Sequence, residues 1–304
     1  MTDSYSVSKG KGGAATLTLR SDVLSKDRKS LRGRQFSYVF VRHGDHTDID
    51  YLAPTFEAIR FLDVGSEQFD WDSISKMPNL ERLSIGAYWI IPWHTIKSEK
   101  LESLAFTWDK RYSISDLNFP SLKHLKMIGW GDEDVDGLSP LKALTYLDMV
   151  DSRNLQNVCS LESLMSLSTL RLRGAPRLRA LDGVQTLNEL VSLHIEGLKK
   201  IDSYDGLSTL KSLRSLVMPG CAPINSLATL ANLPELEFLV LGDTKVEDGD
   251  LKVLRTYPAL KKVMFKNKRG YNWTFAQAKS YFEQLSDDEL EYSPELEDAL
   301  RMRL

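Results

Sequence analysis

The sequence predicts an α/β solenoid, a curved stack of short repeats with a parallel β-sheet on its concave face. Three observations predict it. A short apolar motif recurs at a nearly constant spacing, a second apolar ladder runs between its copies at helical spacing, and glycine and proline recur at fixed places beside them. One such strand cannot bury its apolar side alone, whereas stacked copies bury a continuous core and pair their backbones.

The repeated motif is an apolar residue, two variable residues, an apolar residue, one variable residue and a further apolar residue. Ten consecutive copies begin 21–24 residues apart. Because side chains alternate along a strand, the second and third apolar residues point into the core and the residue between them points outward. The copies are Phe56-Ile59-Phe61, Leu80-Leu83-Ile85, Leu101-Leu104-Phe106, Leu122-Leu125-Met127, Leu144-Leu147-Met149, Leu167-Leu170-Leu172, Leu190-Leu193-Ile195, Leu213-Leu216-Met218, Leu236-Leu239-Leu241 and Leu260-Val263-Phe265.

The segments between the motifs predict tight helical turns on the outer side of the stack. Apolar residues recur three apart, as in Leu161-Leu164-Leu167, a spacing typical of 3₁₀ or short α-helical turns. Glycine follows four motifs by two residues, where the chain must turn, and proline precedes four others by two residues. These residues are Gly129, Gly174, Gly197 and Gly220, and Pro78, Pro120, Pro234 and Pro258.

Segments such as LRLRGAPRLRALDGVQTLNEL and LVMPGCAPINSLATLANLPEL resemble the leucine-rich-repeat superfamily. The likeness covers residues 56–268 and is nearest to the short bacterial and intracellular classes, such as internalin-like and phosphatase-regulatory repeats. It implies a horseshoe-shaped solenoid. The family commonly places Asn or Cys three residues after the third leucine, and here only Cys221 matches. The corresponding residues are Tyr88, Asp109, Trp130, Ser152, Ala175, Leu198, Cys221, Thr244 and Lys268.

A solenoid must cover the apolar ends of its stack, so caps are expected on both sides. Residues 1–13 are rich in Ser, Gly and Lys and are predicted to be a disordered tail. Two strand-like segments within residues 14–55 predict an N-terminal β cap. After the solenoid at 56–268, residues 271–304 predict a helical C-terminal cap, with Thr274 as its N-cap, and an acidic tail.

Charge and hydropathy limit the possible partners and locations. The net charge of −3 gives no reason to expect nucleic acid. The sequence has neither a signal-peptide pattern nor an apolar run long enough to insert into a membrane. We therefore expect a cytoplasmic protein, with a monomer favoured and specialised export left open. The N-terminal 34 residues carry a net +5 and residues 283–304 a net −6, a pattern that fits solvated ends, electrostatic steering or head-to-tail association.

No motif of catalysis, cofactor binding or metal binding is present. The sequence lacks a Gly-rich phosphate loop, G-x-S-x-G, H-E-x-x-H and paired C-x-x-C. Cys159 and Cys221 are expected to be reduced thiols, and the cluster RHGDHTDID a polar loop of the cap rather than a metal site. We expect a protein that is not an enzyme and binds no cofactor. The rival hypothesis is a hydrolase that uses Asp148, His194 and Glu196.

The outward-facing strand residues form the candidate site, because they line the largest concavity of such a fold. The middle repeats place mixed charges and one tyrosine there, and the later repeats place apolar residues there. This composition is typical of protein-binding surfaces. The candidate residues are Arg82, His124, Lys126, Tyr146, Asp148, Asp151, Arg171, Arg173, His194, Glu196, Val217, Phe238 and Val240.

Aromatic residues near the ends of the early strands are a second candidate. They either fill the core, at the positions where the family places its stacked asparagines, or form an exposed ridge. The residues are Tyr88, Trp89, Trp93, Trp108 and Trp130. On the interpretation that they form an exposed ridge, Trp108 and Trp130 are also candidate residues for binding the partner.

The sequence therefore predicts a module that binds a protein partner. An inhibitor or immunity-type role is favoured, because a solenoid without catalytic motifs acts by binding. A scaffold, or a translocated bacterial effector that binds a host protein, is the alternative.

Overall fold

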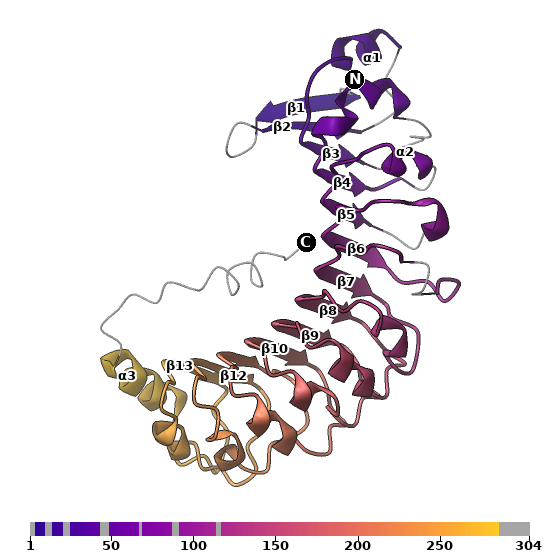
Figure 1. The fold of residues 1–304 in the computed structure, drawn as a ribbon. Coiled ribbons are helices and arrows are strands. Elements are labelled where there is room, and N and C mark those ends of the chain that lie inside the picture. Colours follow the sequence, from indigo (N-terminus) through magenta and orange to yellow (C-terminus); the bar gives the residue numbers. More distant parts are fainter. Residues whose placement is uncertain are drawn as a thin grey trace. The chain divides into compact units, whose positions relative to one another are not determined.

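The computed structural model describes residues 4–9, 14–20, 25–42, 49–66, 69–86, 91–113 and 117–285. The chain divides into two compact units. One consists of Met1–Asp132 and Gly137–Val150, and the other of Glu133–Asp136 and Asp151–Leu304. In each unit, short strands form one side and 3₁₀ or α-helical turns form the other (Figure 1). The predicted α/β solenoid is confirmed.

The first unit contains eight described strands that pair in sequence order. The pair β1–β2 is antiparallel, and every later neighbouring pair is parallel. The strands are β1 (Tyr5–Lys9), β2 (Ala15–Leu19), β3 (Tyr38–Val41), β4 (Phe61–Val64), β5 (Arg82–Ile85), β6 (Ser103–Thr107), β7 (His124–Ile128) and β8 (Tyr146–Val150). The turns are α1 (Ser25–Leu31), η2 (Asp50–Ala58), α2 (Asp72–Ser75) and η3 (Trp93–Thr95), followed by η5 (Asp136–Leu138) where the chain passes between the units.

The second unit contains five described strands, all parallel, and ends in a helix. The strands are β9 (Thr169–Arg173), β10 (Ser192–Glu196), β11 (Ser215–Val217), β12 (Phe238–Gly242) and β13 (Lys262–Phe265). The turns are η6 (Cys159–Ser163), η7 (Val184–Thr186), η8 (Asp205–Thr209), η9 (Leu227–Leu230) and η10 (Lys252–Thr256), and the helix is α3 (Phe275–Leu285).

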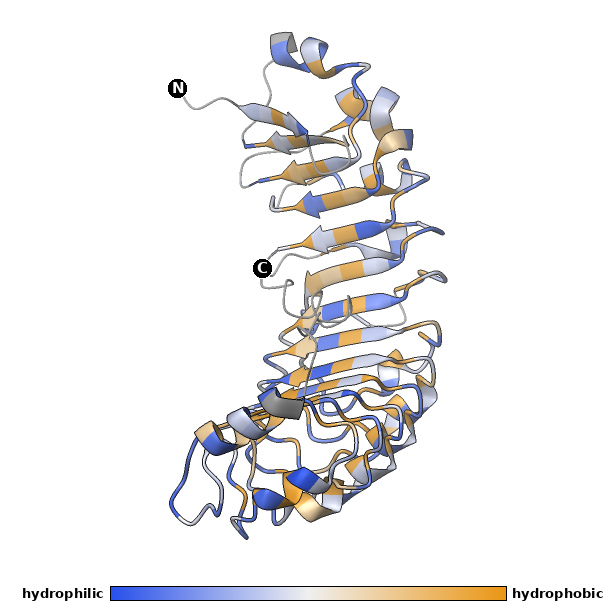
Figure 2. Cartoon of the chain, turned by 90° about the vertical axis from the view of Figure 1, so that its left-hand side faces the viewer, coloured by the Kyte–Doolittle hydropathy of each residue, from blue (hydrophilic) through white to orange (hydrophobic). Residues whose placement is uncertain are grey.

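The repeated leucines build the core by stacking on one another. In the second unit Leu170, Leu193, Leu216 and Leu239 are aligned on adjacent strands, and each is at most 1% exposed. Figure 2 shows the same alternation as hydrophobic bands separated by hydrophilic ones along the strands. Burial of each such side chain contributes about 1.5–3 kcal/mol, so the alternation also fixes the register.

The predicted register of the first repeat is wrong by three residues. Strand β4 aligns Leu62 with Leu83 of β5, so the first copy is Ile59-Leu62-Val64 and not the copy that begins at Phe56. The corrected copy precedes the next by 21 residues, within the spacing of the others. The error arose because Phe61, which points outward, is itself apolar and mimics a core position.

The ladder of buried residues extends into the region predicted to be a separate β cap. Leu17 is aligned with Val39, and Val39 with Leu62, and all three are fully buried. Strands β2 and β3 therefore continue the repeat, with β1 as an antiparallel strand outside them. Since β1 comprises Tyr5–Lys9, the predicted disorder of residues 1–13 is wrong for this segment.

The C-terminal helix begins where the sequence predicts it. The amide of Gln277 donates to Thr274 Oγ1 at 3.3 Å, and the amide of Thr274 donates to Gln277 Oε1 at 3.0 Å. These reciprocal bonds form a capping box, which satisfies amides that have no partner within the helix. The predicted N-cap at Thr274 is confirmed. The predicted acidic tail after Leu285 lies outside the described residues.

Several of the positions where the family places its stacked asparagines face the interior. Trp130, Ser152 and Leu198 are at most 2% exposed. Near the end of the solenoid a hydroxyl group bonds to neighbouring turns instead. Thr244 Oγ1 donates to the carbonyl of Met218 at 2.5 Å and accepts from the amide of Cys221 at 2.9 Å. Buried side chains therefore fill this position in some repeats, whereas in two others a hydrogen-bonding side chain does so. These are Thr244 and Cys221, whose Sγ donates to the carbonyl of Ile195 at 3.4 Å.

Candidate functional site

A strip of apolar side chains crosses the outward side of the sheet in the second unit. Val217, Val240 and Met264 are aligned partners on β11, β12 and β13, and Phe238 lies on β12 two residues before Val240. Met264 is 46% exposed and the other three are half-buried. These four residues are termed the apolar strip. The alternation of the sequence had predicted that they share this side of the sheet.

Polar residues of β9 and β10 lie next to the strip. His194 is aligned with Val217 on one side and with Arg171 on the other. Arg171 Nη2 donates to His194 Nδ1 at 3.1 Å, so the ring proton is on Nε2, which lies 3.5 Å from a carboxylate oxygen of Glu196. This arrangement fixes the tautomer of the histidine.

His194 is held in its neutral form. Burial, and then the charges of Arg171 and Arg173, lower the pKa of His194 to about 4. Its contact with Glu196 at neutral pH is therefore between a neutral N–H and a carboxylate and is not an ion pair. The result is a polar border on one side of the apolar strip, with Glu196 exposed at its outer end.

Two lysines border the other end of the strip. Lys262 lies on β13 two residues before Met264, so these two side chains point to the same side of the sheet. Lys266 lies two residues after Met264, directly after the end of the strand. Lys266 is exposed and Lys262 is half-buried. The strip therefore has a histidine–glutamate border on one side and cations on the other.

The first unit contains the earlier candidates on its own strand face. Lys126 is aligned with Asp148, and the rings of His124 and Tyr146 are 6.1 Å apart. Burial, and then the charge of Arg82, lower the pKa of His124. Arg82 itself is exposed, whereas His124 and Lys126 are half-buried.

Several candidates of the middle repeats are too buried to meet a partner. Asp148 is fully buried, and Tyr146 and Arg171 are each 8% exposed. Alternation predicts on which side of the sheet a residue lies, but not how far long neighbouring side chains cover it. The nine candidates of these repeats also divide between the two units. His124, Lys126, Tyr146 and Asp148 belong to the first unit, and Asp151, Arg171, Arg173, His194 and Glu196 to the second.

The same facts weigh against the hydrolase hypothesis. Asp148 belongs to the other unit and is fully buried. His194 has its basic nitrogen occupied by Arg171, and its low pKa makes it a weak base at neutral pH.

The tryptophans near the ends of the early strands form a buried cluster. Trp93, Trp108 and Trp130 are 2%, 4% and 2% exposed. Trp108 lies 4.3 Å from Trp130 between ring centroids, and Tyr112 contacts both Trp93 and Trp108 edge to face. Trp108 and Trp130 were therefore wrong as partner contacts, because they fill the core. Tyr88 and Trp89 lie outside the described residues.

An aromatic patch in the first unit was not anticipated. Tyr38 is 41% exposed and lies 6.0 Å from Phe61 between ring centroids, and Phe40 lies 5.3 Å from Phe61. Arg42 covers the ring of Phe40 at 4.9 Å and pairs with Asp63 at 3.2 Å. The shifted register of the first repeat concealed this patch, because it assigned Phe61 to the core.

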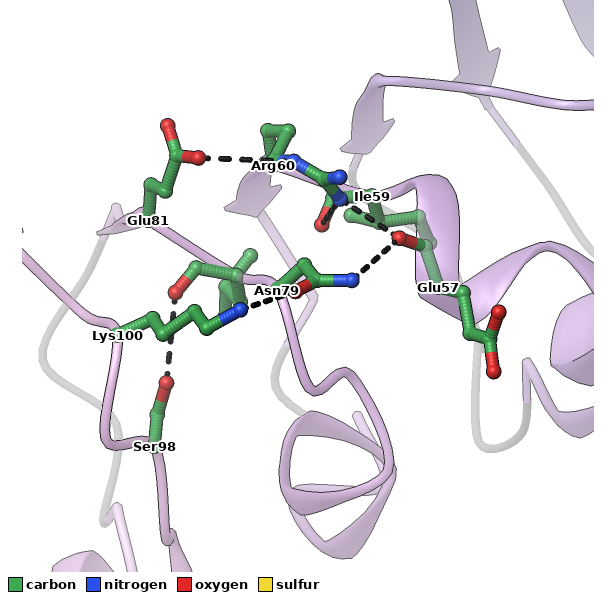
Figure 3. A network of polar contacts seen from close by, with 8 residues as sticks. Glu57, Ile59, Arg60, Asn79, Glu81, Ser98 and Lys100 are labelled. Atoms are coloured by element: carbon green, nitrogen blue, oxygen red, sulfur yellow. Dashed lines mark hydrogen bonds and ion pairs between the residues drawn. The ribbon is translucent and has the colours of Figure 1, made fainter.

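Polar contacts link successive turns of the first unit where the strands begin (Figure 3). Asn79 Nδ2 donates to the carbonyl of Glu57 at 2.9 Å, and Lys100 Nζ donates to Asn79 Oδ1 at 2.6 Å. Arg60 also donates to the carbonyl of Glu57, at 2.6 Å, and its Nε lies 3.5 Å from Glu81. Arg60 therefore braces the stack at the strand starts, and Asp63 takes the outward position of β4.

The described residues offer no alternative chemical site. Within them, no group of three or more His, Cys, Asp or Glu could hold a metal ion, and no helix is long and apolar enough to span a membrane. The two cysteines are free thiols, and burial raises the pKa of Cys221 to about 11. Four residues of the cluster RHGDHTDID, His43, Asp45, His46 and Asp48, lie outside the described residues.

The stacked strands, the turns opposite them and the outward strip define a solenoid repeat protein with an open strand face. No protein-family model and no curated protein matches the sequence. Among solved structures, a leucine-rich-repeat protein of Leptospira interrogans is similar at 16% identity and a TM-score of 0.51, covering 91% of this chain and 89% of that one. This likeness shows that the chain has the fold of a leucine-rich-repeat solenoid.

Two internalins of Listeria monocytogenes are also similar. Internalin C2 matches at 24% identity and a TM-score of 0.42 over 52% of this chain and 68% of its own. A second internalin, inlF, matches at 19% identity and a TM-score of 0.38 over 82% of this chain and 86% of its own.

Proposed function

We propose that this chain is a protein-binding module and that the strand face of its second unit contacts the partner. The observation that carries the proposal is the apolar strip. Four aligned or adjacent apolar side chains remain partly exposed on a rigid sheet, bordered by His194 and Glu196 on one side and by Lys262 and Lys266 on the other. An apolar centre with a polar border is the usual composition of a protein interface.

An inhibitor or immunity-type role, in which the chain sequesters one partner, is the form of this proposal that we favour. It requires binding alone, which agrees with a strand face that carries an apolar strip with a polar border. A scaffold, or an effector that binds a host protein, requires the same surface and is the alternative. For the inhibitor or immunity-type role we also propose a cytoplasmic location.

The test compares two exposed methionines. Met264 lies in the apolar strip, whereas Met165, 66% exposed, lies between η6 and β9 and away from the strand face. Affinity capture with the wild type, Met264→Glu and Met165→Glu should retain the partner with the first and third proteins and lose it with the second. Retention by all three proteins would refute this surface and direct the search to Phe61 in the aromatic patch of the first unit.

Met264 is a better probe than the buried arginine of the same face. Arg171 is 8% exposed and donates to His194. An acidic residue in place of Arg171 would bury a carboxylate, would remove the hydrogen bond to His194 and would lower the stability of the unit. A loss of binding in that variant would not separate recognition from folding.

A further inference from the structure

The last repeat of the second unit is strongly basic. Residues 252–269 contain seven Lys or Arg and no Asp or Glu. Some of this charge is used within the unit, since Lys261 pairs with Glu237 at 3.0 Å and Arg255 lies over two aromatic rings of the C-terminal cap. Lys262 lies on the strand face beside Met264, and Lys266 directly follows the end of that strand.

This arrangement specifies the chemistry of an occupant. The apolar strip favours aliphatic side chains, and the lysines beside it favour carboxylates within a few ångströms of them. A nucleic acid would supply phosphates for the lysines but no aliphatic groups for Val217, Val240 and Met264. An acidic peptide with spaced leucines satisfies both requirements.

The chain itself contains such a peptide. Residues 286–304 hold seven Asp or Glu and two Arg, a net charge of −5. Leucines at 290, 296 and 300 are interspersed among the acidic residues. The leucines of residues 286–304 therefore suit the apolar strip, and the negative charge of these residues is opposite to that of Lys262 and Lys266.

The attachment point brings this segment within reach of the strip. Helix α3 contacts β13 through Phe275 and Phe265, whose ring centroids are 5.7 Å apart, and the helix ends at Leu285. Eleven helical residues span about 16 Å. The 19 residues of 286–304 can extend over roughly 60 Å, and three neighbouring strands measure only about 10 Å across.

We infer that the apolar strip, with Lys262 and Lys266, binds an acidic peptide with spaced leucines, and that residues 286–304 of the same chain are that peptide. The inference rests on the proposed function and adds regulation to it, since the bound segment competes with the partner. Tethering gives an effective concentration of about 1 mM, so a segment that binds with a Kd of roughly 0.1 mM covers the strip about nine-tenths of the time.

The experiment places a photocrosslinking p-benzoylphenylalanine at position 296 of the full chain. Irradiation should join this residue to peptides of β11, β12 or β13 within the monomer, as mapped by mass spectrometry. Lys266→Glu removes one favourable surface ion pair and adds a repulsion of similar size, each worth about fivefold in Kd. The covered fraction then falls from about nine-tenths to about three-tenths, so the yield should fall about threefold. It should also fall at about 1 M NaCl, where the screening length is about 3 Å.

Lys252→Glu is the matched control. Lys252 belongs to the same basic stretch but begins η10 on the opposite side of the sheet, so this variant should keep the wild-type yield. Equal losses in both lysine variants would show only a general charge effect and would overturn the inference. Crosslinks elsewhere on the chain, or only in covalent dimers, would also overturn it.

Partner capture distinguishes this failure from failure of the proposed function. If no crosslink reaches the strip but Met264→Glu still loses the partner, the strip serves a separate protein and only the further inference fails. If the tail does cover the strip, neutralising it with Glu295→Gln and Glu297→Gln should increase the amount of partner captured by the full chain. An unchanged amount of captured partner would contradict competition between residues 286–304 and the partner.

Discussion

Replacement of His194 by asparagine should make the protein less sensitive to acid. In the wild type the pKa of His194 is about 4 in the folded state, against 6.5 for an unperturbed histidine. Between these two values the unfolded state binds a proton that the folded state does not bind. The free energy of unfolding contributed by this group is therefore fully present above pH 6.5 and is lost as the pH falls towards 4.

The magnitude follows from the difference in pKa. The difference between a pKa of 6.5 and a pKa of about 4 corresponds to about 3 kcal/mol at 1.36 kcal/mol per pKa unit, and most of it is lost between pH 7.5 and pH 4.5. Only 19% of the side chain is exposed, so solvent screening is limited. His194→Asn keeps an oxygen that can accept the hydrogen bond from Arg171 but removes the titration.

Urea unfolding followed by circular dichroism at pH 7.5 and pH 4.5 measures this effect. The loss of stability on acidification should be about 2–3 kcal/mol greater in the wild type than in His194→Asn, because all other titrating groups are shared. His94→Asn, at an exposed histidine, is the control and should behave as the wild type. Equal losses in the wild type and His194→Asn would refute the burial of a neutral imidazole at this site.

Three further predictions concern the stack itself, and each is measured by urea unfolding. Thr244→Val should cost about 2–4 kcal/mol, because it leaves a part-buried amide and a buried carbonyl without this hydrogen-bond partner, whereas Thr256→Val at an exposed threonine should change little. Gly183→Ala should be clearly more destabilising than Gly197→Ala. Both glycines have positive φ, but an added Cβ would lie 2.3 Å from a backbone oxygen at the first and has open space at the second, so equal costs would contradict the clash. Leu170→Ala should cost about 2–5 kcal/mol by opening a cavity, and a cost below about 1 kcal/mol would contradict its place in the core.

The outward residues show how far pattern alone could predict the site. Alternation placed Val217, Val240 and Met264 on one side of the sheet, and their alignment follows from the constant repeat length. The same alternation placed Asp148 and Arg171 on the strand face, but did not reveal that both are buried. The exposed fraction of a side chain depends on how far side chains of the neighbouring strands extend over it, and those strands belong to other repeats.

The first repeat shows a second limit of the same kind. Phe61 fits the apolar motif by composition, and only its pairing with Arg82 on β5 places it on the outward side. That pairing revealed the aromatic patch around Tyr38 and extended the ladder back to Leu17. A motif that accepts any apolar residue cannot distinguish two registers when both place apolar residues at its positions.

The sequence by itself determined the solenoid, its repeat length, the turns and the capped C-terminal helix. These depend on local periodicity and on hydrogen bonds between residues close in the chain, such as the pair Thr274 and Gln277. The tertiary structure alone decided the register of the first repeat, the burial of Trp108 and Trp130 and the neutral state of His194. Each of these depends on contacts between turns more than 20 residues apart, where packing and desolvation act on side chains that the local pattern treats as independent.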